Sequence, residues 1–223
     1  MHAGNIPKLE LEALLDPDAK PWRGVKAESL PLMGAPLGLQ PTAAIRATWA
    51  NKKIGAVDRV AVAAVHDGRV LAFRLEWKDP SENRELTDTT SFPDAAAVLL
   101  PAAPDAAVFS MGAPGRPVNA WYWRADEEGR GRNVISEGIG TTRTLDLELV
   151  RARGVWKEGR WRVVIARALR AQSTEPVVQL TPGKTTGFAV TVWDGASGER
   201  GGIKAFSGDW RELRLDAVPT PRS

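Results

Sequence analysis

The sequence contains no cysteine and only two histidines, three methionines and one tyrosine among its 223 residues. Without cysteine the chain cannot form a disulfide, bind zinc or an iron–sulfur cluster through sulfur, or use a thiol nucleophile. Two histidines, of which His2 lies at the start of the chain, are too few for a multi-histidine metal site. These absences exclude most of the familiar catalytic and metal-binding residue sets.

A large charge excess and a long apolar run are also missing. Lys and Arg number 30 against 27 for Asp and Glu, which gives a net charge of +3, and the longest basic run is Lys52-Lys53. Such a small, interspersed excess predicts no nucleic-acid partner. No apolar run approaches the roughly 20 residues that cross a bilayer, so we expect no membrane span. The first residues also lack the basic and apolar parts of an export leader.

The first 40 residues differ in pattern from the rest of the chain. They are rich in turn-forming residues and show one short helical pattern, at 9–15, which Asp16-Pro17 would end. We therefore predict an irregular N-terminal arm, residues 1–40, that packs on a domain formed by residues 41–223.

From residue 41 onward the pattern is typical of short β-strands. Segments 57–65 and 70–77 flank Asp67-Gly68, which is a hairpin signal, and the apolar run 95–100 lies between two prolines, as in a buried strand. Further strands are predicted at 44–49, 118–124, 145–149, 161–165, 188–192 and 213–215. About nine strands without an amphipathic helix predict an all-β fold, a single antiparallel β-sandwich with few short helices.

Conventional catalytic groups are not assembled by any motif. A β-sandwich glycosidase would need two paired carboxylates, but nothing in the sequence pairs its loop acids, namely Asp88, Asp94, Glu127, Glu128 and Glu137. No G-x-S-x-G nucleophile motif is present, and His66 is expected to be exposed in the hairpin turn.

Tryptophan, by contrast, is abundant, with nine residues. Trp121 and Trp123 lie on the same face of one predicted strand. They either pack in the sandwich core or form the wall of a pocket for a flat or sugar-like ligand, and the sequence leaves both readings open. The second reading supports an alternative function, a Trp-lined ligand- or carbohydrate-binding module without redox activity.

Two loops rich in Gly and Pro stand out, at 110–117 and 194–204. They contain Met111 and Lys204. Taken alone, a methionine usually fills a gap in a core and a lysine usually lies in solvent.

These loops and their neighbours resemble a known family, the haem b (gamma) subunits of ethylbenzene dehydrogenase, dimethyl sulfide dehydrogenase, chlorate reductase and selenate reductase, which are type II enzymes of the DMSO reductase family. The resemblance runs from about residue 38 to 215, in the family's order. The stretches that carry it are 92–101 (FPDAAAVLLP), 111–112 (MG), 117–124 (PVNAWYWR), 193–195 (WDG) and 199–207 (ERGGIKAFS).

The resemblance implies a β-sandwich that holds one non-covalent haem b, with Met111 and Lys204 as axial ligands. It fits a chain that lacks the cysteines of a CxxCH attachment, since the haem must then be held by axial bonds and apolar contact. Trp121 and Trp123 could supply such contact, and Gly202 would let the backbone approach the macrocycle.

Five further residues are candidates for binding the haem. Arg116, Lys184 and Arg200 are candidate propionate partners by charge and loop position. Met33 rivals Met111, because both begin a Met-Gly-Ala-Pro sequence, and His66 rivals Lys204, because distantly similar cytochromes use Met and His.

The resemblance also implies the biological setting. An iron with two protein ligands has no open site for substrate, so the expected function is electron transfer, with no catalytic residue in this chain. The implied partners are a molybdenum catalytic subunit, an iron–sulfur subunit and an external carrier such as a cytochrome c or a quinone-linked protein. Family members work in the periplasm, so we expect that location with the leader removed, and the cytoplasm otherwise.

Overall fold

The structure of the protein, a computed structural model, describes residues 1–7, 10–86, 92–145 and 149–219. It is mostly β, which confirms the predicted fold class. The helical elements are short: α1 (Leu11–Leu14), η1 (Lys20–Trp22), η2 (Leu37–Leu39) and α2 (Ala43–Trp49). The strands are β1 (His2–Asn5), β2 (Glu28–Pro31), β3 (Met33–Gly34), β4 (Arg59–His66), β5 (Val70–Lys78), β6 (Ala95–Pro101), β7 (Gly112–Ala113), β8 (Arg116–Arg124), β9 (Arg132–Ser136), β10 (Arg143–Thr144), β11 (Val150–Trp156), β12 (Arg160–Ala168), β13 (Thr185–Trp193), β14 (Ala205–Phe206) and β15 (Arg211–Leu215).

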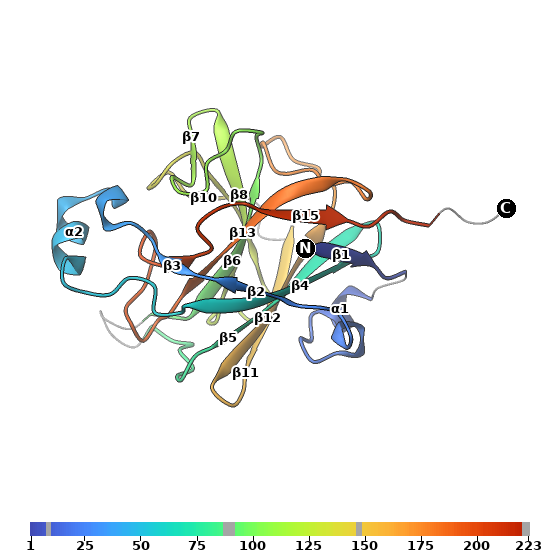
Figure 1. Cartoon of the computed structure of the whole chain (residues 1–223), viewed down its shortest axis with the longest axis horizontal. Coiled ribbons are helices and arrows are strands. Elements are labelled where there is room, and N and C mark those ends of the chain that lie inside the picture. Colours follow the sequence, from blue (N-terminus) through green and yellow to red (C-terminus); the bar gives the residue numbers. More distant parts are fainter. Residues whose placement is uncertain (8–9, 87–91, 146–148, 220–223) are drawn as a thin grey trace.

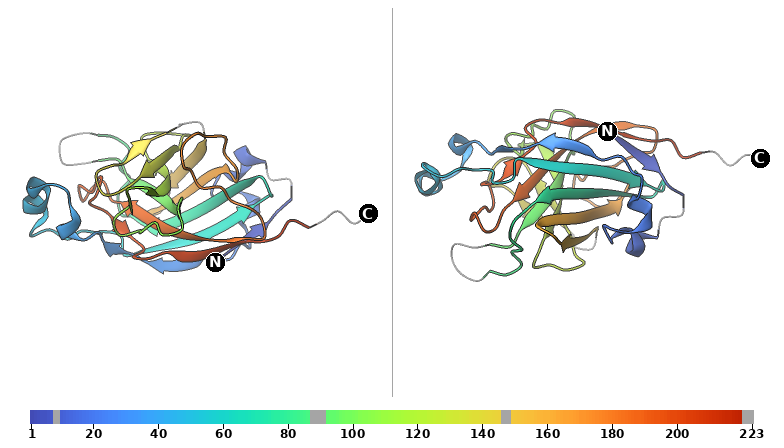
Figure 2. Two further views of the ribbon diagram at one scale, coloured as in Figure 1. Left: turned by 90° about the horizontal axis from the view of Figure 1, so that it is seen from above. Right: turned by 60° about the horizontal axis from the view of Figure 1, so that its bottom comes forward.

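The strands form two layers of a sandwich (Figures 1 and 2). One layer has the order β11-β12-β5-β4-β1-β15-β13, and we call it the support sheet. The other has the order β10-β9-β8-β6-β13-β14-β3, and we call it the site sheet. Strand β13 belongs to both, because its first four residues pair with β15 and its last five pair with β6.

The main core lies between the two layers and takes alternate residues from each strand. On β6 its members are Ala96, Val98 and Leu100. The intervening residues, Ala95, Ala97 and Leu99, belong to a second buried cluster on the outer face of the site sheet. Both faces of β6 are thus buried, which explains why its sequence is apolar without interruption.

Tryptophans dominate one part of the main core. The ring centroids of Trp123 and Trp161 lie 4.9 Å apart, and those of Trp161 and Trp77 lie 6.4 Å apart. Trp121 meets Phe73 edge to face at 5.9 Å. All four indoles are almost fully buried, so they hold the two layers together through contact area.

The N-terminal residues take part in the sandwich. Strands β1 and β2 pair with β4, and Leu14, Leu15 and Trp22 cover the outer face of the support sheet. The predicted short helix near the start is present as α1, and the division of the chain at residue 40 stays a prediction.

Two details of the predicted fold are wrong, and one lies outside the described residues. Segment 44–49 is predicted as a strand, but it forms helix α2, whose first turn is capped where the Thr42 hydroxyl accepts a hydrogen bond from Ile45 N–H. The sheet is not purely antiparallel, because β1 runs parallel to both β4 and β15. Of the strand predicted at 145–149, residues 146–148 lie outside the described part of the chain.

Candidate functional site

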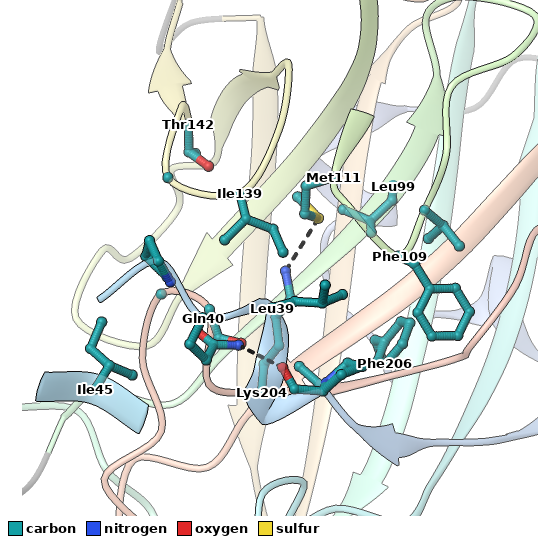
Figure 3. A pocket seen from close by; sticks show the side chains of 17 residues that line it. Leu39, Gln40, Ile45, Leu99, Phe109, Met111, Ile139, Thr142, Lys204 and Phe206 are labelled. Atoms are coloured by element: carbon teal, nitrogen blue, oxygen red, sulfur yellow. Dashed lines mark hydrogen bonds between the residues drawn. The ribbon is translucent and has the colours of Figure 1, made fainter. Parts of the chain in front are cut away.

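The side chains of Lys204 and Met111 meet on the outer face of the site sheet (Figure 3). Lys204 Nζ lies 3.3 Å from Met111 Sδ, although the residues are 93 positions apart in sequence. Lys204 directly precedes β14, and Met111 directly precedes β7. The fold therefore brings together the two residues that the sequence nominates as ligands.

The backbone at Met111 is in an unusual conformation. Its φ is +57°, in the left-handed region that non-glycine residues seldom occupy, and Gly112 follows at φ +88°. The turn is closed by hydrogen bonds from Met111 N–H to Val108 O (3.1 Å) and from Gly138 N–H to Met111 O (3.0 Å). Such a conformation costs about 1–3 kcal/mol and persists where the surrounding structure imposes it, often at functional sites.

Glu199 anchors the loop that carries Lys204. Its carboxylate is only 1% exposed and accepts hydrogen bonds from the N–H groups of Gly55 (2.7 Å), Ala56 (3.0 Å) and Asp194 (3.1 Å). Burial raises the pKa of Glu199, and the three backbone donors oppose that shift. The Lys204 loop is thereby fastened to the chain segment that follows α2.

Gln40 fixes the same loop from the other side. Its Nε2 donates to Gly202 O at 3.1 Å, and a Cβ placed on Gly202 would come within 2.2 Å of its Oε1. The absence of a side chain at Gly202 therefore admits Gln40, whereas the sequence suggested room for a macrocycle.

Two cavities adjoin the Lys204–Met111 contact, one on each side. The first, of about 230 Å³, lies beside η2 and α2, and the second, of about 250 Å³, lies over β8 and β9. Both are lined by Leu99, Met111, Thr142, Gly201 and Lys204, so the contact divides a continuous space. Joined, the two reach the roughly 300–1,000 Å³ that is typical of ligand pockets.

Small and aromatic residues shape the second cavity. Ala97 and Ala120 line it from neighbouring strands of the site sheet. Tyr122 and Trp193 also line it and meet edge to face with centroids 5.3 Å apart. Short side chains on a strand surface leave a shallow apolar floor, which suits a flat ligand.

The surroundings of Lys204 make its proton easier to remove than that of a lysine in water. The residue is 7% exposed, and burial lowers the pKa of its amine to about 8. Its Nζ lies 5.1 Å from the centroid of the Trp193 ring, and within the described residues no carboxylate forms an ion pair with it. Because the neutral amine alone has a free lone pair, this environment suits metal coordination.

Trp121 and Trp123 do not line either cavity. Both side chains point into the main core, on the opposite face of β8 from Tyr122. The structure therefore supports core packing, the first of the two readings of this tryptophan pair, and gives the cavity wall to Trp193.

The three predicted basic partners are separated in space. Arg200 lines a surface hollow beside the second cavity, where its guanidinium lies 4.2 Å from the ring centroid of Phe92. Arg116 is exposed at the start of β8, and Lys184 lines a different groove with Pro101. Of the three, the structure thus brings only Arg200 near the Lys204–Met111 pair.

Neither rival ligand lines the two cavities. Met33 is 54% exposed on β3, and His66 is fully buried at the end of β4 in the support sheet. The prediction that His66 is exposed is wrong, because β1 pairs alongside the end of β4 with Asn5 opposite His66; the His66 Nδ1 accepts the N–H of Gly68 at 3.1 Å.

Three of the five loop acids make local contacts, and a fourth, Glu128, is exposed. Asp94 is buried and accepts hydrogen bonds from three N–H groups, those of Asn83, Gly195 and the Trp161 indole. Glu127 pairs with Arg132, and Glu137 accepts from Gly115 N–H. Asp88 lies outside the described residues. Asp94 has an unforeseen carboxylate neighbour in Asp79, but neither lines a described cavity.

Several residues that line the cavities were not predicted from the sequence. Gln40, Tyr122, Trp193 and Arg132 all contact the cavities. The alternation along β8 could have pointed to Tyr122, because it lies opposite in phase to Trp121 and Trp123. Arg132 brings a guanidinium to the second cavity, although Glu127 already accepts two hydrogen bonds from it.

Fold and site together define a class: a β-sandwich protein with a buried amine–thioether pair in an apolar cavity on one outer sheet face. A family model described as "Ethylbenzene dehydrogenase" matches residues 19–148 and 144–205. The chain belongs to this family.

Curated relatives agree with this assignment. The chain is 36% identical to "Chlorate reductase subunit gamma" of Ideonella dechloratans, over 72% of this chain and 66% of that protein. It is 31% identical to "Putative respiratory nitrate reductase heme subunit ORF7" of Haloferax mediterranei, over 91% and 69%. It is 30% identical to "Dimethylsulfide dehydrogenase subunit gamma" of Rhodovulum sulfidophilum, over 66% and 58%. The chain thus spans about three fifths to two thirds of the length of these relatives.

Solved structures share the fold at low sequence identity. A family 9 carbohydrate-binding module of Caldicellulosiruptor kristjanssonii in complex with glucose superposes with a TM-score of 0.55 at 11% identity, covering 98% of this chain and 96% of that one. The cellotriose complex gives a TM-score of 0.52. These likenesses support the β-sandwich.

No helix in the described ranges is long and apolar enough to cross a membrane.

Proposed function

We propose that the protein binds one non-covalent haem b through Met111 Sδ and Lys204 Nζ and serves as an electron-transfer subunit of a molybdenum-containing oxidoreductase complex. The observation that carries the proposal is the 3.3 Å contact between a buried amine and a thioether inside an apolar cavity. The relative named as a heme subunit supports the choice of cofactor.

The residues present fit this cofactor. Lysine coordinates metal only as the neutral amine, and a pKa of about 8 lets the iron displace the proton near neutral pH. Nζ and Sδ lie 3.3 Å apart, so the two side chains would have to separate to admit an iron between them. Both side chains are unbranched and can rotate away from each other, and the two cavities would receive the ring of the haem.

The bound haem would supply one-electron redox chemistry, and a thioether ligand raises the potential of its iron. Held by both Met111 and Lys204, the iron would have no open site for substrate, so this chain would transfer electrons only. Ala97, Ala120 and Trp193 give the second cavity an apolar lining, and Arg132 in the same lining and Arg200 in the adjoining hollow would be placed to meet propionates.

The proposed partners rest on the names of the relatives. Two relatives are named as gamma subunits of chlorate reductase and of dimethylsulfide dehydrogenase. We infer that this chain likewise joins a molybdenum catalytic subunit and an iron–sulfur subunit. It would relay single electrons between the iron–sulfur subunit and an external carrier, such as a cytochrome c or a quinone-linked protein, in the periplasm.

A haemin titration tests the proposal. The purified protein should bind one equivalent of haemin and show a low-spin b-type Soret band, with sharp α and β bands on reduction. Met111→Leu and Lys204→Leu should each shift the spectrum toward high spin. The matched controls Met33→Leu and Lys184→Leu should leave it unchanged. Protein that takes up no haemin would refute the cofactor, and an unchanged Lys204→Leu spectrum would refute the ligand.

The carbohydrate-binding alternative has less support in the structure. It depended on Trp121 and Trp123 as a pocket wall, and both indoles lie in the main core with at most 1% exposure. Titration with cellotriose while tryptophan fluorescence is followed should therefore give no saturable change.

A further inference from the structure

An apolar patch is exposed at the mouth of the first cavity. The large apolar side chains exposed in the described part of the chain are Met33 (54%), Leu39 (43%), Leu86 (63%), Phe109 (47%) and Val218 (46%). Leu39 and Phe109 line the first cavity, and Met33 is the β-sheet partner of Phe206, whose ring meets Phe109 at 5.2 Å. We call Met33, Leu39 and Phe109 the mouth patch; Figure 3 shows Leu39 and Phe109 beside the Lys204–Met111 pair.

A positively charged segment borders the mouth patch. Residues 29–57 contain Arg46, Lys52 and Lys53 and no Asp or Glu, so this segment has a charge of +3, equal to that of the whole chain. Ile54, next to Lys53, packs against Gly34, next to Met33, so closely that a Cβ on Gly34 would lie 2.1 Å from Ile54 O. Arg46 also donates a hydrogen bond to the carbonyl of Gln40, next to Leu39, so the segment that carries the cations runs beside the patch.

Helix α2, within this segment, is little covered by the described residues of the chain. None of its residues is buried, and it projects at the end of the molecule away from α1 in Figure 1. Ile45 lines the first cavity, and Lys52 Nζ lies 5.5 Å from the centroid of the Trp49 ring. In the described part of the chain no carboxylate forms an ion pair with Arg46, Lys52 or Lys53. An exposed helix with such cations beside an apolar patch is typical of an interaction surface.

We propose that the mouth patch and the α2 segment form the docking face for an electron-exchanging protein whose contact surface carries carboxylates around an apolar centre. This rests on the proposed function, because docking there brings the partner next to the Lys204–Met111 pair. Charge complementarity selects the occupant: Arg46, Lys52 and Lys53 attract acidic groups, and Met33, Leu39 and Phe109 contact apolar ones. A polyanion such as nucleic acid would use the cations and leave the patch exposed.

Electron-transfer kinetics with two redox proteins of opposite charge test the proposal. Stopped-flow mixing of the haemin-loaded protein with reduced plant-type ferredoxin, an acidic protein, measures the transfer of one electron from its cluster to the ferric haem. Mixing the reduced protein with ferric cytochrome c, a basic protein, measures one electron passing the other way. The ferredoxin rate constant should fall as salt rises, and the cytochrome c rate constant should increase or stay flat.

Charge reversal locates the docking face. Lys52→Glu/Lys53→Glu should lower the ferredoxin rate constant at least tenfold at low ionic strength. Lys20→Glu/Lys26→Glu, which reverses two exposed lysines in and just after η1, should change it less than twofold. Met33→Gln should lower it even at high salt. Equal effects of the two double variants, or no salt dependence, would overturn the docking face.

Calorimetric titration of the same variants with oxidised ferredoxin separates this proposal from the cofactor assignment. Binding heat does not require haem, so the loss of affinity in Lys52→Glu/Lys53→Glu should appear with or without haemin. Wild-type affinity in that variant would refute the docking face while the low-spin spectrum remains. Absent haemin uptake with charge-dependent ferredoxin binding would refute only the proposed function.

Discussion

Lys204 Nζ lies 3.3 Å from Met111 Sδ, in a cavity where the closest aromatic neighbour of the amine, Trp193, has its ring centroid 5.1 Å away. An ammonium group in such a place is costly to bury, whereas an amine is not. Met111 pays a backbone cost as well, since its φ is +57°. Both residues of the pair therefore cost folding free energy, which is typical of a functional site.

Replacing Lys204 by Met should change how stability depends on pH. Burial lowers the pKa of Lys204 from 10.5 to about 8, so the unfolded chain holds the proton more tightly, and stability rises as pH increases from 8 toward 10.5. The full effect is at most about 3 kcal/mol. Without haemin, Lys204→Met should be more stable than wild type at pH 7 and lose this rise. Urea unfolding at pH 7, 8 and 9.5 measures it, and parallel curves for the two proteins would contradict it. Lys184→Met is the exposed control.

Asp79→Asn should flatten the pH dependence in a lower range. Burial, and next the mutual charge of the two carboxylates, raises the pKa of Asp94 to about 7, and burial raises that of Asp79 to about 6. The protonated acids are favoured in the folded state, so this contribution is full below pH 4 and is lost as pH rises through 6 and 7. The two shifts correspond to a loss of up to about 5 kcal/mol for wild type between pH 4.5 and 7.5, and Asp79→Asn should lose about half of that. The exposed Asp58→Asn should behave as wild type.

Glu199→Gln should destabilise the Lys204 loop. The amide has one acceptor oxygen in place of two, so at least one of the buried N–H groups of Gly55, Ala56 and Asp194 loses its partner. The expected cost is about 1–3 kcal/mol in the free energy of unfolding, with weaker haemin binding. Glu158→Gln, at an exposed turn, should cost less than about 0.5 kcal/mol. Equal stability of the two variants would show that the anchor is dispensable.

Gly202→Ala and Gln40→Ala should be coupled. The new methyl group would overlap Gln40 Oε1, so Gly202→Ala alone should cost about 1–3 kcal/mol. Gln40→Ala removes the obstacle, and the double variant should be more stable than the sum of the single effects predicts, by about 1 kcal/mol. Gly38→Ala, where a Cβ has nothing within 4 Å, is the control. Strict additivity in urea unfolding would rule out the close approach.

Trp121 and Trp193 should respond differently to replacement by leucine. Trp121 is fully buried in the main core, so Trp121→Leu should lower stability by about 2–4 kcal/mol and leave the haem spectrum intact. Trp193 lines the second cavity, so Trp193→Leu should weaken haemin affinity and shift the Soret band with a smaller stability cost. Thermal unfolding combined with haemin titration distinguishes these outcomes. A spectral change in Trp121→Leu alone would reverse the assignment.

Local sequence patterns predicted most of the strands because each pattern reports a local property. Alternation marked β5, the Asp67-Gly68 turn marked the β4–β5 hairpin, and Asp67 Oδ1 indeed accepts the N–H groups of Arg69 and Val70. Helix α2 was missed because seven residues are too few for a helical period to show. Its start signal was nonetheless present, in the Thr42 cap before two alanines.

The family resemblance nominated Met111 and Lys204, and the motif order was enough for that. It could not show that Trp121 and Trp123 face away from them, because the side of a strand that faces a cavity depends on what covers each sheet face. The contact between Gly202 and Gln40 joins residues 162 positions apart, and no local pattern records such a pairing.

The β character of the chain, its short turns and the two ligand candidates are properties of consecutive residues, so they are legible in the sequence. Other features cannot be read from consecutive residues. They are the direction of β1, the second buried face of β6, the lowered pKa of Lys204 and the charged border of the mouth patch. Each depends on which distant segments come into contact, and burial, which sets both packing and pKa, is defined only once the two layers have closed.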